Sequence, residues 1–287
     1  MNVLVATDGS KYGRWAMNWV ATLPLAERPS VMALHVVDIA ALRAPFLAQP
    51  VIAGTERYIQ EEIQRMEARS GKALKEAKQQ LALLKLKGTA RKEQGAVAPT
   101  ILKRAPKRDG LLVVGSQGLD ALDRFMLGSV STNLIHHATC PVLVIKGEAA
   151  PLRQITLATD GSDASAKALA FVLSKFRPDV SAGNGGRVSI HISVIHVMPL
   201  VKYPGLKKAG DKILEQSVRK LVEAGFMAEP LCQFGNPAEK IMKAASKQHA
   251  DLIVMGAKGL AAVDRFLLGS VSTRVVQHAK GSVLVVR

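Results

Sequence analysis

Short runs of apolar residues alternate along the chain with longer stretches in which apolar residues recur at helical spacing. Residues 2–7 (NVLVAT) and 111–115 (LLVVG) are typical of strands buried on both faces, and residues 188–198 are predicted as one strand. Residues 11–23 and 56–87 repeat apolar positions every three or four residues, which predicts helices. Strands that alternate with helices predict an α/β fold built on a parallel sheet.

This pattern occurs twice. Residues 112–146 align without a gap with residues 253–287, and more than half of the aligned positions are identical. Such a repeat indicates a duplicated domain, and half of a 287-residue chain is an ordinary domain size. We therefore expect two domains, residues 1–147 and 151–287, joined by a short linker and packed against each other.

The strongest part of the repeat is a glycine-rich loop between a strand and a helix. In the first copy, Gly115 and Gly118 follow the strand, and Gly128, Ser129 and Ser131 open the helix. Glycine lets a ligand approach the main chain, and a helix N-terminus offers free N–H groups and a positive dipole end to a phosphate, to which the hydroxyls add donors. A tight turn with a helix cap is the plainer alternative. The second copy keeps the pattern, with Gly256, Gly259, Gly269, Ser270 and Ser272.

The spacing G-2x-G-9x-G-[ST] resembles the nucleotide-binding signature of the universal stress protein family, and the resemblance covers nearly the whole chain. It implies two tandem Rossmann-like domains, each an open five-stranded parallel sheet in the order 3-2-1-4-5 with flanking helices. The switch point of that order lies between strands 1 and 4, where ligands of open α/β sheets bind. Asp8 after strand 1 and Gly115 after strand 4 would meet there.

The resemblance also implies which residues hold the nucleotide. Asp8 and Asp160 would lie beside the adenine or the ribose, although aspartate here is also a good helix cap. Val36 and Val197 would place their main chain against the adenine. The expected nucleotide-binding residues are Thr7, Asp8, Val36, Val114, Gly115, Gly118, Gly128, Ser129, Val130 and Ser131 in the first half and Thr159, Asp160, Val197, Met255, Gly256, Gly259, Gly269, Ser270, Val271 and Ser272 in the second.

Basic side chains in and near the loops add a secondary expectation. Lys258 stands in the second loop where the first has Gln117, and it would make the second site more favourable for anions. Arg124 and Arg265 lie inside the repeated DRF and could approach phosphates, but pairing with a neighbouring aspartate or simple exposure is the plainer interpretation.

The last strand of each half, VLVIK or VLVVR, is an apolar edge in this strand order, and such an edge invites pairing. In the family, dimers form through this edge, so the two halves of a tandem chain are expected to pair with each other. Residues 88–95 (GTARKEQG) are so polar that they predict an outer edge strand. A homodimer of the whole chain and a regulatory protein partner are left open.

Composition and charge limit the function classes. No apolar run is long enough to span a membrane, and the start of the chain lacks the features of a secretory signal. The two cysteines fit a reducing compartment and give no metal-ligand cluster, so we expect a cytoplasmic protein. The net charge of +16 allows nucleic-acid binding, but aromatic residues make up only 4%, and a generally basic surface is the simpler interpretation.

Three functions are compatible with these features. The first is an ATP-binding stress protein, in which the nucleotide changes the conformation or the partner affinity without a clear catalytic apparatus; Mg²⁺, AMP and ADP stay open as ligands. The second is a slow ATPase, for which we find no carboxylate placed to hold a metal at the phosphates. The third is an interaction scaffold or nucleic-acid binder that uses the basic surface. The two intact glycine loops favour the first.

Overall fold

The computed structural model describes residues 1–43, 55–107, 109–118, 127–181, 187–199, 204–259 and 268–287. In the first half the strands are β1 (Asn2–Ala6), β2 (Ser30–Val37), β3 (Lys87–Gln94), β4 (Leu111–Gly115) and β5 (Val142–Ile145). Their counterparts in the second half are β6 (Gln154–Ala158), β9 (His191–Met198), β10 (Met227–Phe234), β11 (Leu252–Gly256) and β12 (Ser282–Val286).

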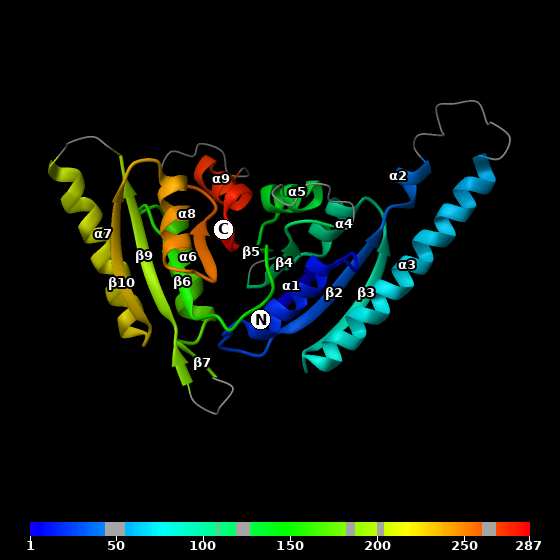
Figure 1. Ribbon diagram of the computed structural model, residues 1–287, viewed down its shortest axis with the longest axis horizontal. Helices are drawn as coiled ribbons and strands as arrows, with labels where there is room; N and C mark the ends of the chain where they lie inside the picture. The colour runs from blue at the N-terminus through cyan, green and yellow to red at the C-terminus, as the bar shows by residue number, and fades with distance from the viewer. Residues whose placement is uncertain (44–54, 108, 119–126, 182–186, 200–203, 260–267) are drawn as a thin grey trace.

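These strands form one continuous ten-stranded sheet that runs through both halves, in the order β10-β9-β6-β11-β12-β5-β4-β1-β2-β3 (Figure 1). Neighbouring strands are parallel, except that β12 and β5 at the centre are antiparallel. The α/β class with a mainly parallel sheet is confirmed. Within each half the strands follow the 3-2-1-4-5 order that the resemblance implies.

Helices cover both faces of the sheet. One face carries α1 (Lys11–Thr22), α3 (Thr55–Leu83), α6 (Asp163–Lys175) and α7 (Pro204–Glu223), and the other carries α4 (Val97–Arg104), α5 (Ser129–His137), α8 (Pro237–Lys247) and α9 (Ser270–His278). The short helix α2 (Ile39–Arg43) follows β2. Side chains alternate between the faces: Val3 and Val5 of β1 pack with the first group of helices, and Leu4 and Ala6 with the second. Each face therefore has its own core, and both cores continue across the two halves.

The two halves are joined through β5 and β12, where Leu143 lies opposite Leu284. Both side chains are buried in the same core cluster. A second contact joins the ends of α1 and α6, where Leu25 forms an antiparallel β-bridge with Phe176. The expected pairing through the last strands is therefore present, and it merges the two expected sheets into one without leaving either apolar edge open.

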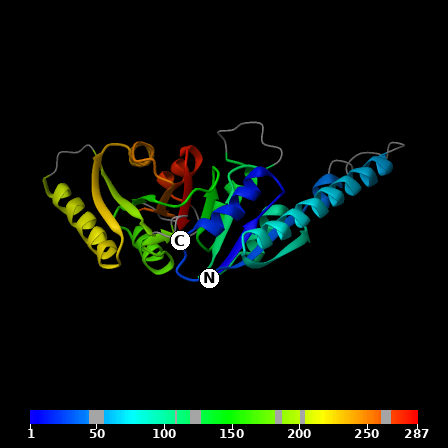
Figure 2. The ribbon, with the colours of Figure 1, turned by 60° about the horizontal axis from the view of Figure 1, so that its bottom comes forward.

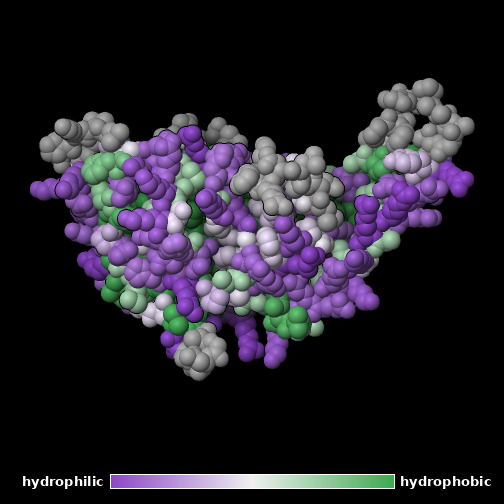
Figure 3. Space-filling model, viewed as in Figure 1, coloured by the Kyte–Doolittle hydropathy of each residue, from purple (hydrophilic) through white to green (hydrophobic). Residues whose placement is uncertain are grey.

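The outer edges of this sheet are β3 and β10 (Figure 2). Most side chains of β3 (KGTARKEQ) are exposed, as the polarity of residues 88–95 predicts. The long helix α3 packs beside β3 and lies close to the expected range 56–87. On the face shown in Figure 3, hydrophilic side chains predominate. Among the described residues, no helix combines the length and the apolar character that crossing a membrane requires.

One expectation about the second half is wrong. Residues 188–198 are not a single strand, because the chain divides at Ile190 into β8 (Arg187–Ser189) and β9. β8 pairs with β7 (Asp179–Ser181) in a separate antiparallel hairpin, whereas β9 lies between β6 and β10. The N–H of Ile190 donates to the carbonyl of Pro178 at 2.8 Å, so this N–H pairs with a residue outside the main sheet. The apolar pattern runs on through both strands and gives no sign of this break.

We expect Leu143→Ala to lower the free energy of unfolding by roughly 2–5 kcal/mol, because it opens a cavity at the junction of the two halves, where Leu143 is 0% exposed. The matched control is Leu83→Ala in α3, since Leu83 is 82% exposed and should change stability by less than about 0.5 kcal/mol. Urea unfolding of both variants measures the difference. Equal effects would mean that the β5–β12 junction is not part of the common core.

Candidate functional site

The site begins at the carboxyl end of β1, where the chain turns into α1. Gly9 has a φ of +81°, which glycine adopts without strain. The hydroxyl of Ser10 caps α1 by accepting the N–H of Gly13 at 3.2 Å, and Oδ1 of Asp8 accepts the N–H of Ser10 at 2.9 Å. The cap is therefore Ser10, and Asp8 holds the cap in place rather than providing it.

The second half repeats this turn after β6. Gly161 has the same φ of +81°, and the hydroxyl of Ser162 caps α6 by accepting the N–H of Ser165 at 3.3 Å. Oδ1 of Asp160 accepts both the N–H and the hydroxyl of Ser162, at 3.0 and 2.6 Å. The two halves thus present an aspartate in the same local setting.

Each aspartate also lies against the glycine loop that follows the neighbouring strand. A Cβ placed on Gly118 would come within 2.8 Å of Oδ2 of Asp8, and a Cβ on Gly259 within 2.6 Å of Oδ2 of Asp160. β1 pairs with β4, and β6 pairs with β11. The switch point therefore brings the two predicted parts of the site together, and a side chain at either glycine would push the carboxylate aside.

The remaining glycines of the first loop differ in what their neighbours require. A Cβ on Gly115 would lie 2.6 Å from Cβ of Tyr12, so α1 packs directly on the end of β4. At Gly128 the nearest atom to an added Cβ is the carbonyl oxygen of Ser116 at 3.5 Å, an ordinary contact. Packing in the described part of the chain accounts for the glycine at Gly115 and not for the one at Gly128.

Gly128 is also the N-cap residue of α5, and as a glycine it has no side chain with which to cap this helix end. The N–H of Gly128 donates to the carbonyl of Ser116 at 2.8 Å, which closes the loop. The next N–H groups, from Ser129 onward, belong to the first turn and have no acceptor within the helix. They form the positive end of the helix dipole beside the carboxyl end of β4. α9 begins in the same way at Gly269.

The two serines of each loop have different roles. Ser129 is exposed, whereas Ser131 is buried and its hydroxyl donates to the carbonyl of Gly115 at 2.6 Å. Likewise, the buried Ser272 donates to the carbonyl of Ala257 at 2.7 Å. The expectation that these two hydroxyls add donors to the site is therefore not met, because they tie the helix to the loop. Only their N–H groups stay candidates for a ligand.

Other predicted residues can reach the site only through their main chain. Val114 and Met255 are each 5% exposed, with their side chains in the core. Val36 lies beyond Leu34, the last residue of β2 that pairs with β1, so its main chain passes the open end of that ladder. The half-buried residues of this kind, packed against the same core, are Val36, Val130, Val197 and Val271.

Thr7 and Thr159 hold the turns together. The carbonyl of Thr7 lies 2.9 Å from Nδ1 of His35, and that of Thr159 lies 2.8 Å from Nδ1 of His196. The Thr7 hydroxyl accepts the N–H of Gly9 at 3.3 Å. These two threonines and two histidines therefore fix the turns that carry Asp8 and Asp160.

The loops of the two halves differ at one position. Gln117 is buried in the first loop, whereas Nζ of Lys258 in the second is buried and has no hydrogen-bond partner among the described residues. A Cβ on Gly269 would lie 3.3 Å from Cα of Lys258, so this lysine lies beside the N-terminus of α9. A buried ammonium without a partner is costly and fits an anion that arrives from outside. Arg124 and Arg265 lie outside the described residues.

Together these features define a tandem α/β protein in which each half has, at its switch point, a glycine loop and a helix that begins at a glycine N-cap. A model of the universal stress protein family matches residues 1–146 and 151–287. The chain therefore belongs to the universal stress protein family.

Similar proteins cover the whole chain or one half of it. A universal stress protein of Mycolicibacterium smegmatis is 28% identical over 99% of this chain and 96% of its own length. The crystal structure of one from Archaeoglobus fulgidus covers 100% of this chain and 98% of that chain at 20% identity, with a TM-score of 0.68, which shows the fold. Another from Archaeoglobus fulgidus, in complex with dAMP, is 22% identical and covers 47% of this chain and 98% of that chain, with a TM-score of 0.36.

We expect alanine to separate the roles of the two glycines. Gly115→Ala should lower the free energy of unfolding by about 2 kcal/mol, since its methyl group would lie 2.6 Å from Tyr12 and force α1 to shift. Gly128→Ala should lower it by less than about 1 kcal/mol, the scale of a poorer N-cap. Denaturant unfolding compares the two variants, and a larger loss for Gly128→Ala would show that packing does require that glycine.

Proposed function

We propose that this protein binds an adenine nucleotide, with ATP as the preferred form, in each half, and that it acts in the cytoplasm as a regulatory module without its own catalytic apparatus. The observation that carries the proposal is the start of α5 and of α9. Both helices begin at a glycine, which has no side chain to cap them, and the glycine loop before each helix lies against the aspartate that follows the neighbouring strand. The likeness of both loops to the family's nucleotide-binding signature supports it.

The phosphates would be held by main-chain N–H groups. In the first half these belong to Ser129, Val130 and Ser131, in the first turn of α5, where the helix dipole favours negative charge. Gly128 leaves the approach open because it has no side chain. In the second half Ser270, Val271 and Ser272 would do the same, with Nζ of Lys258 as an added cation.

The base and the ribose would lie across the switch point from the phosphates. Asp8 and Asp160 follow β1 and β6 and provide carboxylate acceptors against the glycine loops. Val36 lies beyond the last residue of β2 that pairs with β1, and Val197 lies beyond the last residue of β9 that pairs with β6. The main chain of these two residues can therefore bond the edge of a base. The described residues contain no group of three His, Cys, Asp or Glu side chains that could hold a metal ion.

An acidic N-cap tests this arrangement. Gly128 has φ −63° and ψ 154°, which any residue can adopt, and aspartate is a strong N-cap. Gly128→Asp should therefore keep or raise the free energy of unfolding. Its carboxylate should accept hydrogen bonds from the N–H groups of the first turn and repel the phosphates. The same change at Gly269 is tighter, with Cα of Lys258 3.3 Å from the new Cβ.

We expect about two ATP per chain in wild type by calorimetric titration, about one in Gly128→Asp or Gly269→Asp, and none in the double variant. The matched control is Gly71→Asp, which adds the same charge on α3 where a Cβ meets nothing within 4 Å, and it should still bind two. Unchanged stoichiometry in the double variant, or no binding by wild type, would overturn the proposal and favour the scaffold. Hydrolysis that the double variant abolishes would instead revive the slow ATPase.

The difference between the loops leads to a second expectation. Lys258→Gln gives the second loop the residue of the first, and it should weaken ATP binding at the second site about tenfold, the value of one charge-assisted hydrogen bond. AMP, with fewer charges, should lose less. The measurement is made in the Gly128→Asp background, and the first site, measured in Gly269→Asp, serves as the control. Equal losses of ATP and AMP would show that the lysine does not contact the β- or γ-phosphate.

A further inference from the structure

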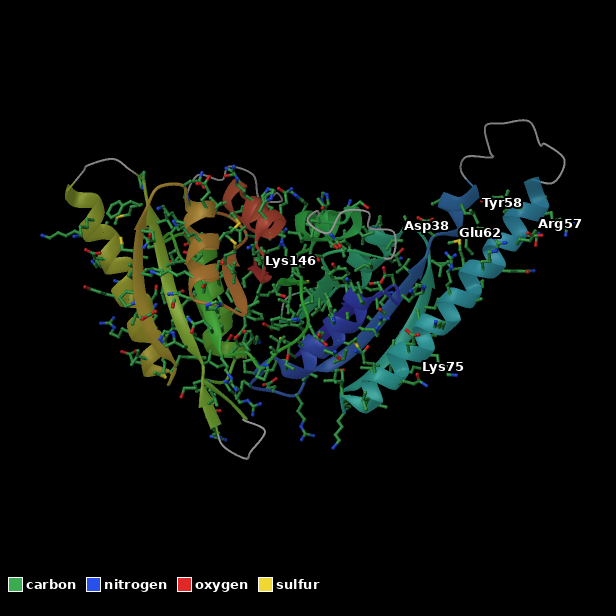
Figure 4. All side chains as sticks on the ribbon, viewed as in Figure 1. Asp38, Arg57, Tyr58, Glu62, Lys75 and Lys146 are labelled. Carbon is green, nitrogen blue, oxygen red and sulfur yellow. The ribbon has the colours of Figure 1, made fainter. Side chains whose placement is uncertain are left out.

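Lys146, which directly follows β5, reaches across the junction into the second half. Its N–H donates to the hydroxyl of Ser282 at 3.2 Å. Its Nζ donates to the carbonyls of Gln277 and Ala279 at 3.2 and 2.6 Å. These carbonyls lie at the C-terminus of α9, where helices leave acceptors unpaired and the dipole is negative. Figure 4 shows Lys146 at the centre of the molecule, between the halves.

Arg287, the equivalent residue of the repeat, makes the reciprocal contact. It follows β12, and its guanidinium donates to the carbonyls of Ile135 and, at 3.1 Å, His136. These two residues form the last turn of α5 in the first half. Each half therefore supplies a cation that holds the C-terminus of the other half's helix.

The same two helices present their N-termini to the candidate nucleotide sites. Each has nine residues, so about 13 Å separates its two ends. That distance exceeds the Debye length of about 8 Å at physiological salt, so a direct field between the cation and a phosphate is weak. The cation acts mainly by fixing where the helix lies, because a short helix held at one end moves as a rigid body.

We propose that Lys146 and Arg287 are positioning residues that make each nucleotide site depend on the opposite half: Lys146 sets the second site through α9, and Arg287 sets the first site through α5. This inference rests on the proposed nucleotide binding. It predicts that a substitution of Lys146 or Arg287 alters the nucleotide affinity of the site in the opposite half.

The two cations differ in how pH affects them. Burial lowers the pKa of Lys146 to about 8. The titratable side chains next to the carbonyls that it caps are His278 and Lys280, with Glu148 following in its own chain segment, and burial alone causes the shift. Burial also lowers the pKa of Arg287, but a guanidinium keeps its charge at any pH used for binding. Only the second site should therefore respond between pH 7 and 9.

The test uses full-length chains in which one site is blocked. In the Gly128→Asp background, Lys146→Met should weaken ATP binding at the second site about fivefold or more, the lower end of ordinary coupling between sites. In the Gly269→Asp background, the same change should leave the first site within about twofold. Arg287→Met should give the reverse pattern. Circular dichroism and thermal unfolding confirm that each variant is folded.

A pH series and a conservative variant cover the case in which Lys146→Met does not fold. ATP affinity at the second site should fall as pH rises from 7 to 9, because the Lys146 cation is present below its pKa of about 8 and lost above it. Lys146→Arg should remove this dependence and keep the affinity, and the first site should stay flat over the same range.

The outcomes separate the two proposals. If wild type binds two ATP but Lys146→Met and Arg287→Met weaken both sites equally, their own half only, or neither, the positioning role is wrong and nucleotide binding stands. If the second site keeps its pH dependence in Lys146→Arg, the inference also fails. If wild type binds no ATP, both proposals fail together.

Discussion

The antiparallel pairing of β5 with β12 is the contact on which the rest of the molecule depends. Each half ends in an apolar strand that cannot stay at a sheet edge in water, and each edge is covered by the other. The pairing continues the cores on both faces of the sheet through both halves. It also places the residue after each last strand, Lys146 or Arg287, against the opposite half.

The parallel strands on either side of this junction decide where chemistry can take place. Because β1 and β4 run in the same direction as neighbours, the loops that follow them meet at one end of the sheet. The steric fit between Asp8 and Gly118 is a consequence of that arrangement, as is the fit between Asp160 and Gly259. A helix that starts there at a glycine directs the N–H groups of its first turn, which have no acceptor within the helix, toward this end of the sheet. The second half repeats this arrangement, with Lys258 at the position of Gln117.

Much of the fold follows from the sequence, because the repeat and the apolar strands are local patterns. Alternating strands and helices predicted the α/β class, and the polarity of residues 88–95 predicted the edge position of β3. The break at Ile190 was missed, since apolar residues continue on both sides of it. At the site, sequence placed Asp8 near the glycine loop but could not separate Gly115 from Gly128, because the clearance around a Cβ depends on tertiary distances.

The direction of the Ser131 hydroxyl and the contacts of Lys146 and Arg287 could not be predicted from the sequence either. The hydroxyl of Ser131 turns inward to a carbonyl rather than toward a ligand, a choice of direction that residue type does not encode. Lys146 and Arg287 make these hydrogen bonds across the junction between the halves, so no pattern within one copy reveals the contacts. The available signal was that both copies place a basic residue at the same position after the last strand.

The central claim is that the N-termini of α5 and α9 hold the phosphates of an adenine nucleotide. The most direct measurement is a crystal structure of the wild-type protein with ATP. We predict one nucleotide in each half, with phosphate oxygens within hydrogen-bond distance of the N–H groups of Ser129 and Val130 and of Ser270 and Val271. Nucleotide bound elsewhere, or both helix ends empty at saturating ATP, would contradict the account.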